Sequence, residues 1–251
     1  MARKYGWKKD PKDHRDWQFK HVLKALETKL PAFVDIRKQL SPVENQEDIG
    51  SCVANAVVGA LEFLELQSLR GWARWWAKYR DLSRLFVYYN ARQADGDVEE
   101  DAGTTIRSAV KTVAQFGVCP EKTWPYVTSN WPLRPLDRAY KQAKVYQIMD
   151  YHRASPGYEV KQALALGFPV PFGATLYPAF EDVGSDGKVP MPEGTSIGGH
   201  AMLIVGYDLL KQVYIVRNSW GTDWGDKGYC YFPCGYLENP NLADDFWVIR
   251  K

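Results

Sequence analysis

A cysteine stands at the start of a long apolar segment, in the sequence Gly50-Ser51-Cys52. The residues that follow, VANAVVGALEFLEL, place apolar side chains at the 3.6-residue spacing of a helix with a wide buried face. The free N–H groups and the positive dipole end of a helix N-terminus favour a thiolate and lower its pKa. This position suits a nucleophilic cysteine, although a lone cysteine on an apolar helix is more often a small buried hydrophobe.

Two further polar residues lie in apolar segments nearer the C-terminus. His200 stands in IGGHAMLIVGYD and Asn218 in VYIVRNSWGTDWG, with a short turn expected at 208–210. This spacing predicts an antiparallel hairpin that sets His200 and Asn218 opposite each other. An amide there accepts a hydrogen bond from one imidazole nitrogen and leaves the other nitrogen facing the thiol. Trp220 and Trp224 are expected to shield that bond from water and so strengthen it.

Gln46 lies shortly before the cysteine, in NQEDIGSC. A side-chain amide beside the backbone N–H of Cys52 supplies two donors for one developing oxyanion. A glutamine in a loop means nothing by itself. The assignment of Gln46 therefore depends on Cys52 and His200 coming together.

The elements that must position these residues begin with helices. The first is predicted from Ser51, a suitable N-cap, and a second from about Leu82-Ser83 through LFVYYNAR. A third is predicted over about 104–116, where Gly117 suits a C-cap. The first half of the chain is therefore expected to be helical.

The second half changes character at about residue 145. Beyond it, β-branched and aromatic residues alternate with turn signals, which predicts a set of short strands. The fold class is therefore α+β, with a folded body over 31–251. Within it we expect a helical lobe over about 31–145 and a β-rich lobe over about 146–251.

Residues 1–30 differ from this body and are expected to form a basic N-terminal arm. They hold nine Lys or Arg against four Asp or Glu, whereas residues 31–251 carry a net charge of −3. Aromatic residues spaced along a basic strand suit a segment that lies across an acidic, partly apolar groove. The tendency of chain termini to stay loose favours the alternative, an arm on the back of the molecule.

Composition and charge exclude several classes of protein. The chain has 251 residues, of which 45% are hydrophobic and 25% charged, as in folded proteins. A net charge of +2 is too balanced to argue for a nucleic acid partner. No apolar run is long enough to span a membrane, and the charged start does not resemble a secretory signal. We therefore expect a cytoplasmic protein, with export by a non-classical route left open.

Other residues with possible metal or nucleophile chemistry are assigned no role. Cys230 and Cys234 lie close together without a second cysteine pair or a nearby histidine, so we expect no zinc site. Cys119 is expected to pack in the core, and the acidic loop 95–101 lacks the spacing of a calcium loop. No metal or organic cofactor is implied. The histidines without an identifiable partner are His14, His21 and His152.

The segments QEDIGSCVANA, GGHAMLIVGYD and VRNSWGTDWGDKGYCYF resemble the papain-like cysteine peptidases. They occur in the order of that family: a glutamine, the cysteine, the histidine, and an asparagine within an N-S-W-G-x-x-W-G block. The resemblance covers the chain from about residue 30 to the C-terminus. The segments LSRLFVYYNAR, GVCPEKTWPY and DDFWVIRK are more similar to the bacterial, archaeal or viral branch than to plant or lysosomal enzymes.

This resemblance implies a papain-like two-lobed fold with the active site in the cleft between the lobes. A helical left lobe would carry Cys52, and a β-barrel-like right lobe would carry His200 and Asn218. The implied activity is that of a cysteine endopeptidase acting on peptide or protein substrates through a thioester acyl-enzyme. Gln46 and the N–H of Cys52 would bind the oxyanion.

The resemblance also implies the residues of the substrate cleft. The main specificity pocket is lined by the residue after the histidine and by one residue of the strand in FPVPFGATLY, here Ala201 and Gly173, with Gly199 beside them. Because all are small, we expect the pocket to admit a bulky apolar or aromatic P2 residue, the second residue on the acyl side of the scissile bond. Asp244 is expected near the pocket floor, where it would permit a basic P2 residue. Gly103 occupies the place of the glycine-rich cleft segment of the family.

The sequence departs from the family pattern in a few places. Ile49 stands where many members have a cysteine, so that disulfide is absent, and Val53 replaces the usual aromatic residue after the nucleophile. About 30 residues precede the body, too few for the long inhibitory propeptide of the family. None of these departures removes a catalytic group.

Two alternatives remain open for the activity. An amine that captures the same acyl-enzyme would give ligase or transpeptidase activity, and a different cleft would give an exopeptidase. A non-catalytic peptide-binding homologue is the second alternative. The presence of all four groups of the site argues against it.

Overall fold

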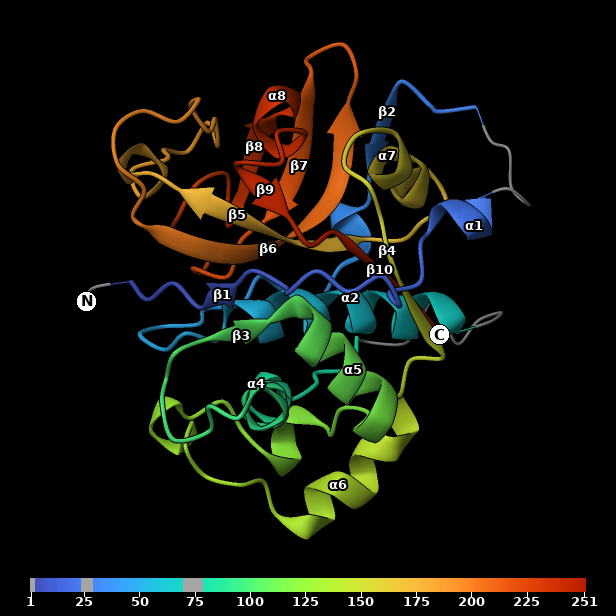
Figure 1. Cartoon of the computed structure of the whole chain (residues 1–251), viewed down its shortest axis with the longest axis vertical. Helices are drawn as coiled ribbons and strands as arrows, with labels where there is room; N and C mark the ends of the chain where they lie inside the picture. The colour runs from blue at the N-terminus through green and yellow to red at the C-terminus, as the bar shows by residue number, and fades with distance from the viewer. Residues whose placement is uncertain (1–2, 24–28, 70–78) are drawn as a thin grey trace.

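A long helix, α2 (Cys52–Ser68), runs through the middle of the molecule (Figure 1). The structure is a computed structural model, and it describes residues 3–23, 29–69 and 79–251. All residues of α2 over 52–65 are buried, because the helix packs against helices on one side and against strand β6 on the other. The helix predicted to begin at the cysteine is confirmed.

Two further helices of at least eleven residues pack beside α2. α4 (Arg84–Asp95) and α5 (Ile106–Phe116) pack against α2 and against each other. The side chains of Ser83 and Thr105 accept N–H groups of the first turns, and Gly117 ends α5 with a positive φ. The predicted helices are therefore confirmed within a few residues. The shorter helices are α1 (Lys20–Leu23), α6 (Asp137–Ala143), α7 (Tyr158–Ala165) and α8 (Cys234–Leu237), with 3-10 turns at Arg37–Gln39, Glu121–Thr123, Thr128–Asn130, Lys144–Tyr146 and Pro178–Phe180.

The other part of the molecule is built on one antiparallel sheet. Its strand order is β8-β7-β6-β5-β9, and β2 pairs with β6 beside this path. The described strands form an open sheet that does not close into a barrel, so the two-lobed α+β fold holds without the closed barrel that the resemblance suggested. The strands are β2 (Phe33–Asp35), β5 (Val170–Leu176), β6 (Gly198–Asp208), β7 (Val213–Arg217), β8 (Tyr229–Pro233) and β9 (Ala243–Asp244).

Strand β6 separates two hydrophobic cores. Ala201, Leu203 and Val205 face the core around α2, whereas Met202 and Ile204 face the core of the β-rich part. This alternation follows from the two-residue period of a strand. Two smaller sheets complete the fold, one in which β4 (Asp150–Arg153) pairs antiparallel with β10 (Trp247–Arg250), and one in which β1 (Trp7–Lys8) pairs in parallel with β3 (Thr104–Thr105).

The N-terminal arm runs between the helical and the β-rich part, above α2, as Figure 1 shows in blue. Strand β1 lies between β3 and β6 and contacts both. Of the two placements left open by the sequence, the structure therefore has the one in the cleft. Asp10 and Phe19 are buried, Phe19 in the core of the β-rich part. The arm is thus more deeply integrated than its polar composition suggested.

The hairpin of β6 and β7 has a different register from the one that the sequence predicts. Leu203 pairs with Arg217 and Asp208 with Val213, and a bulge lies between Ile204 and Gly206. The turn is longer than predicted, and the bulge adds a further residue on one strand. The longer turn shifts the pairs beside it, and the bulge moves the pairs beyond it back by one residue, which leaves His200 and Asn218 about two residues from the predicted pairing.

Candidate active site

Cys52 is the first residue of α2, and its side chain is fully buried. Ser51 occupies the N-cap position, but its hydroxyl contacts the hydroxyl of Tyr126 at 2.6 Å and makes no capping bond. The backbone N–H of Ala201 donates to Sγ of Cys52 across 3.4 Å. Because Ala201 follows His200 on β6, the helix and the strand bring the predicted cysteine and histidine to one place.

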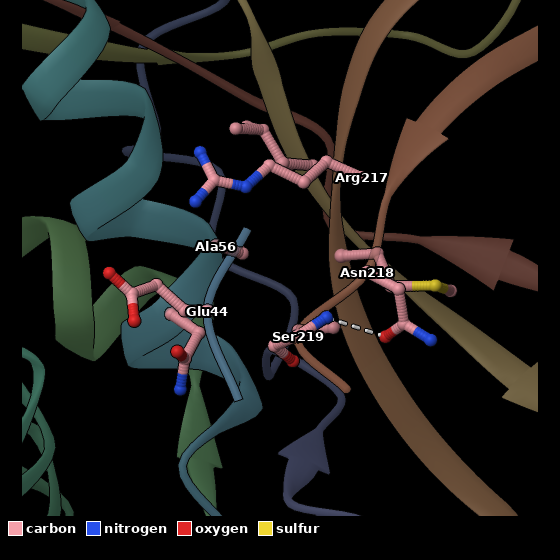
Figure 2. A pocket seen from close by; sticks show the side chains of 9 residues that line it. Glu44, Ala56, Arg217, Asn218 and Ser219 are labelled. Carbon is pink, nitrogen blue, oxygen red and sulfur yellow. Dashed lines mark hydrogen bonds between the residues drawn. The ribbon is translucent and has the colours of Figure 1, made fainter. Parts of the chain in front are cut away.

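His200 and Asn218 are hydrogen-bonded, with 2.8 Å between Nε2 of the ring and Oδ1 of the amide. The backbone N–H of Ser219 donates to the same Oδ1 at 2.8 Å, the dashed bond of Figure 2. Since Oδ1 accepts both bonds, Nε2 of His200 carries the hydrogen. Nδ1 has no hydrogen-bond partner in the described residues, so its lone pair is available for a proton.

His200 and Asn218 are in contact although the predicted register of their strands is wrong. Continued past its last pair, the observed register makes these residues diagonal neighbours on adjacent strands, not directly opposite ones. Diagonal neighbours are still within reach of long or aromatic side chains. A histidine and an asparagine can therefore meet in either register.

Aromatic rings cover this hydrogen bond. The ring of Trp220 lies 4.9 Å from that of His200, at an interplanar angle of 31°. Trp224 packs edge-to-face on Trp220, and Phe180 contacts both tryptophans. The rings stand where the sequence places a shield, and the exclusion of water strengthens the bond beneath them.

Gln46 is fully buried beside the start of α2. Its Oε1 accepts the hydroxyl of Ser219 at 2.7 Å, which fixes the orientation of the amide. Its Nε2 donates to the carbonyl oxygens of Ile49 and Lys4, both at 3.0 Å. An oxyanion site requires a hydrogen-bond donor that can reach a peptide carbonyl oxygen near the cysteine, and Nε2 of Gln46 is such a donor. In this structure that carbonyl belongs to the arm.

Residues 3–9 of the arm pass directly over these groups. The backbone N–H of Gly6 lies close enough to Sγ of Cys52 to lower the pKa of the thiol. A Cβ atom on Gly6 would lie 1.9 Å from the carbonyl oxygen of Gly50, so only glycine fits at this crossing. A Cβ atom on Gly103 would lie 2.0 Å from the carbonyl oxygen of Gly6. Gly103, which the sequence assigns to the substrate cleft, thus lies against the arm.

Ion pairs tie the basic residues of this segment to carboxylates on both sides of it. One partner comes from the β-rich part, and two come from the acidic loop 95–101. The salt bridges are Lys4–Asp101, Lys8–Asp97 and Lys9–Asp244. Because the lysines are partly exposed, these pairs contribute less to stability than the buried contacts of the arm.

The indole of Trp7 fills a space bounded by Gly173, Gly199 and Asp245, which we call the Trp7 pocket. A Cβ atom on Gly173 would lie 1.9 Å from Cε2 of the indole, and one on Gly199 would lie 2.9 Å from Cε3. Nε1 of Trp7 donates to Oδ2 of Asp245 at 3.0 Å. Two of the residues expected to line the specificity pocket are therefore in contact with an aromatic side chain.

Two other expected pocket residues adjoin the same space: Gly173 pairs with Ala201 on β6 and with Asp244 on β9, and Asp244 lines a cavity together with Trp7 and Gly199. Ala201 is fully buried and contacts the sulfur through its N–H, and Asp244 pairs with Lys9 at 2.9 Å and with Arg153 at 3.1 Å. The carboxylate that reaches the indole is Asp245, which the sequence analysis missed. Asp245 follows the end of β9 with a φ of 58°, in the left-handed region, so the alternation of a strand does not extend to it and does not reveal which of the two aspartates reaches the indole.

Burial sets the protonation states of the thiol and the imidazole. It raises the pKa of the Cys52 thiol to about 11, although backbone N–H donors oppose it. It lowers the pKa of His200 to about 4; the hydrogen bond to Asn218 opposes this shift, and the charge of Arg3 adds to it. The expected low thiol pKa is wrong for this covered state, because desolvation outweighs the N–H groups of the helix end.

The residues assigned no role stay apart from this centre. Cys119, Cys230 and Cys234 are buried and form no disulfide. His152 packs among aromatic rings, including that of Phe19. Over residues 3–23, 29–69 and 79–251 no cluster of metal-binding side chains occurs. In the same ranges, no helix has the length and apolar character needed to cross a membrane.

Comparison with known proteins gives consistent matches. The family model of the papain family cysteine proteases matches residues 30–245. An uncharacterised peptidase C1-like protein of Acanthamoeba polyphaga mimivirus is 34% identical over 283 aligned residues, which cover 100% of this chain and 88% of that protein. The crystal structure of xylellain, a cysteine protease from Xylella fastidiosa, superposes with a TM-score of 0.87 at 36% identity, covering 100% of this chain and 98% of xylellain.

Proposed function

Since the chain belongs to the papain family of cysteine peptidases, we propose that it is an endopeptidase that works through Cys52, His200 and Asn218. The observation that carries this proposal is the buried hydrogen bond from Nε2 of His200 to Oδ1 of Asn218, next to the sulfur of Cys52. It fixes the ring so that the nitrogen with the lone pair is the one left for the thiol.

The proposed reaction divides peptide hydrolysis into two steps. Nδ1 of His200 takes the proton of the Cys52 thiol, and the sulfur attacks the peptide carbonyl carbon. Nε2 of Gln46 and the N–H of Cys52 stabilise the oxyanion. The imidazolium then protonates the leaving amine, and the C–N bond breaks to give a thioester. In the second step, His200 takes a proton from water, the hydroxide cleaves the thioester, and the thiol is restored.

We also propose that residues 3–9 hold the enzyme inactive. The carbonyl at Gln46 belongs to the Lys4–Tyr5 peptide bond, whereas the N–H at the sulfur belongs to the Tyr5–Gly6 bond. The sulfur thus meets a hydrogen-bond donor, and the oxyanion donor meets the carbonyl of a neighbouring peptide group. The arm engages both groups without presenting one scissile bond to them together.

The test is a library of internally quenched peptides blocked at both ends, offered to a variant that lacks residues 1–9. An endopeptidase cleaves blocked peptides, whereas an exopeptidase needs a free end. Mass spectra recorded with an added amine would reveal transfer products if the acyl-enzyme serves a ligase or transpeptidase. Absence of cleavage in the same truncation carrying Cys52→Ala is the control. A peptide-binding homologue would bind the library and cleave none of it.

A further inference from the structure

The Trp7 pocket contains a buried carboxylate aimed at an N–H group. The side chain of Asp245 is fully buried, and its Oδ2 accepts Nε1 of Trp7 at 3.0 Å and the backbone N–H of Asp10 at 2.7 Å. Its Oδ1 accepts from Arg153. A buried carboxylate needs such donors, because each oxygen left without one loses its solvation without replacement.

The shape of the pocket suits a flat group. Gly173 and Gly199 allow the indole to approach the backbone of β5 and β6, since a Cβ atom on either would overlap the arm. A planar side chain fits in this space with its edge toward Asp245. The pocket thus combines a flat apolar wall with one charged acceptor.

The donors of Asp245 differ in how firmly they are held. The carboxylate of Asp10 accepts Nη1 of Arg153 at 2.9 Å, Nε1 of Trp247 at 2.8 Å and the N–H of Arg107 at 3.1 Å. Asp10 is therefore anchored to the body by three bonds of its own. When residues 3–9 leave the cleft, Asp10 keeps its bond to Asp245, and the place of the indole N–H becomes vacant.

The position of the pocket follows from the order of the arm residues. The ring of Tyr5 lies beside His200 and Trp220, Gly6 meets the sulfur, and Trp7 follows on the far side. His200 protonates the leaving amine in the proposed reaction, so the leaving side of a substrate lies toward Trp220. The Trp7 pocket therefore lies on the acyl side, one residue beyond the sulfur, where a P2 side chain would be placed.

We propose that Asp245 determines specificity and that the Trp7 pocket selects a P2 side chain that is planar and ends in an N–H donor, a tryptophan or an arginine. This inference rests on the proposed peptidase function. It differs from the expectation based on Asp244, because the indole N–H of Trp7 donates to Asp245, whereas Asp244 pairs with Lys9 and Arg153.

The first test uses the arm as the ligand and needs no turnover. In the full chain, the rate at which iodoacetamide alkylates Cys52 reports how often the arm leaves the site; mass mapping separates Cys52 from the other cysteines. Trp7→Phe keeps the ring and removes the N–H, and Asp245→Asn alters the acceptor. Each is expected to raise the rate about tenfold, the usual effect of one hydrogen bond to a charged group. The control is Trp17→Phe, at an exposed tryptophan of the same arm.

The double variant decides whether the two groups act through each other. If Asp245 recognises the indole N–H, Trp7→Phe adds little in the Asp245→Asn background. If the increase in alkylation rate in the double variant equals the product of the increases in the two single variants, the proposal is overturned. It is also overturned if Trp7→Phe alkylates no faster than the control Trp17→Phe. The latter comparison stands even if Asp245→Asn fails to fold.

The second test measures kcat/KM in the full-chain variant Trp7→Gly, with peptides that differ only at P2. Tryptophan and arginine are expected to exceed phenylalanine and leucine about tenfold, and Asp245→Asn should remove that advantage. Asp244→Asn should leave the ratio of tryptophan to phenylalanine unchanged. The proposal is overturned if the phenylalanine peptide is cleaved as fast as the tryptophan peptide. It is also overturned if the preference for tryptophan is lost in Asp244→Asn but kept in Asp245→Asn. If no peptide is cleaved, the peptidase function fails, and the alkylation cycle alone decides whether Asp245 recognises an N–H group.

Discussion

The carbonyl oxygen of Lys4 lies 3.0 Å from Nε2 of Gln46, at the place where the proposed mechanism stabilises the oxyanion of a substrate. The same amide is held from behind by the hydroxyl of Ser219, next to Asn218. Ser219 thus holds both Gln46, the proposed oxyanion donor, and Asn218, the partner of the histidine. The site is fully assembled before any substrate arrives, and the arm covers it.

The proposed roles predict how single substitutions reduce activity in the truncation lacking residues 1–9. Cys52→Ala and His200→Ala should abolish turnover, because they remove the nucleophile and the proton carrier. Gln46→Ala should lower kcat by about 10²-fold or more, the usual effect of losing one oxyanion donor. Asn218→Ala should be milder, since it orients the ring without taking a proton. Steady-state cleavage of a quenched peptide measures all four, and residual hydrolysis by Cys52→Ala would contradict the mechanism.

Removing residues 1–9 should raise kcat/KM toward small peptides. If the arm occupies the cleft in about nine molecules of ten or more, freeing it gives at least about tenfold. The chain from Asp10 onward keeps its anchoring bonds in this variant. Lys12→Ala, at an exposed position beyond the anchor, is the control and should not change kcat/KM. Unchanged activity in a folded truncation would leave the arm with a purely structural role.

A longer truncation, which also removes the buried part of the arm, should destabilise the fold. Removing residues 1–28 deletes Phe19, which is fully buried, and leaves Arg107 and Arg153 without the carboxylates of Asp16 and Asp10. Deleting a buried phenylalanine side chain alone costs about 3–5 kcal/mol. The melting temperature should therefore fall far more than in the shorter truncation. Similar melting temperatures for the two truncations would show that the buried part of the arm contributes little.

The reactivity of Cys52 should depend on pH differently with and without residues 3–9. With the arm in place, burial raises the pKa of the thiol to about 11, so alkylation should be slow at neutral pH and should rise steadily toward alkaline pH. Without these residues, water reaches the thiol and His200, and the helix N-terminus and the imidazolium then favour the thiolate. The rate should become high already at mildly acidic pH. Identical pH profiles would show that the arm does not control solvation of the site.

Stability should fall as the pH rises through the interval between the unfolded and folded pKa values of Glu62. Burial in α2 raises the pKa of this carboxyl from 4.5 to about 7, although the Leu82 N–H, at 2.8 Å, opposes the shift. Between these values the folded state keeps a proton that the unfolded state has lost, so stability declines with increasing pH. Between about pH 5 and about pH 8, the wild type should lose on the order of 2–3 kcal/mol more than Glu62→Gln. Urea denaturation at both pH values measures the difference, and parallel losses would contradict the assignment.

The sequence predicts the site better than it predicts what surrounds the site. The helix at Cys52 follows from a local period, and the hairpin that carries His200 and Asn218 follows from apolar strands around a turn. The bulge at 204–206 has no local signal, because nothing near it distinguishes an extra residue in one strand. Its effect on the site is small, since diagonal neighbours still touch.

The sequence suggests two positions for the arm, in the cleft or on the back of the molecule, but contains nothing that decides between them. The contacts of Trp7 join residues more than 150 positions apart in the sequence, with Gly173, Gly199 and Asp245. No local pattern at Trp7 specifies such partners. The charges of the arm indicate only that an acidic surface would suit it. The effect of the arm on the thiol pKa was missed for the same reason, because it is a property of the covered site.

The anchor at Asp10 and Phe19 has a consequence for how the proposed inhibition would respond to the surroundings. A segment that leaves the cleft while its next residues stay docked remains attached by a short tether. The length of that tether sets the effective concentration of the segment at the cleft. The ratio of open to closed molecules is then the same in a dilute extract and in a crowded cell. Neither dilution nor overproduction shifts it. A substrate that competes for the cleft displaces the arm reversibly, whereas a single proteolytic cut in the tether releases the arm irreversibly.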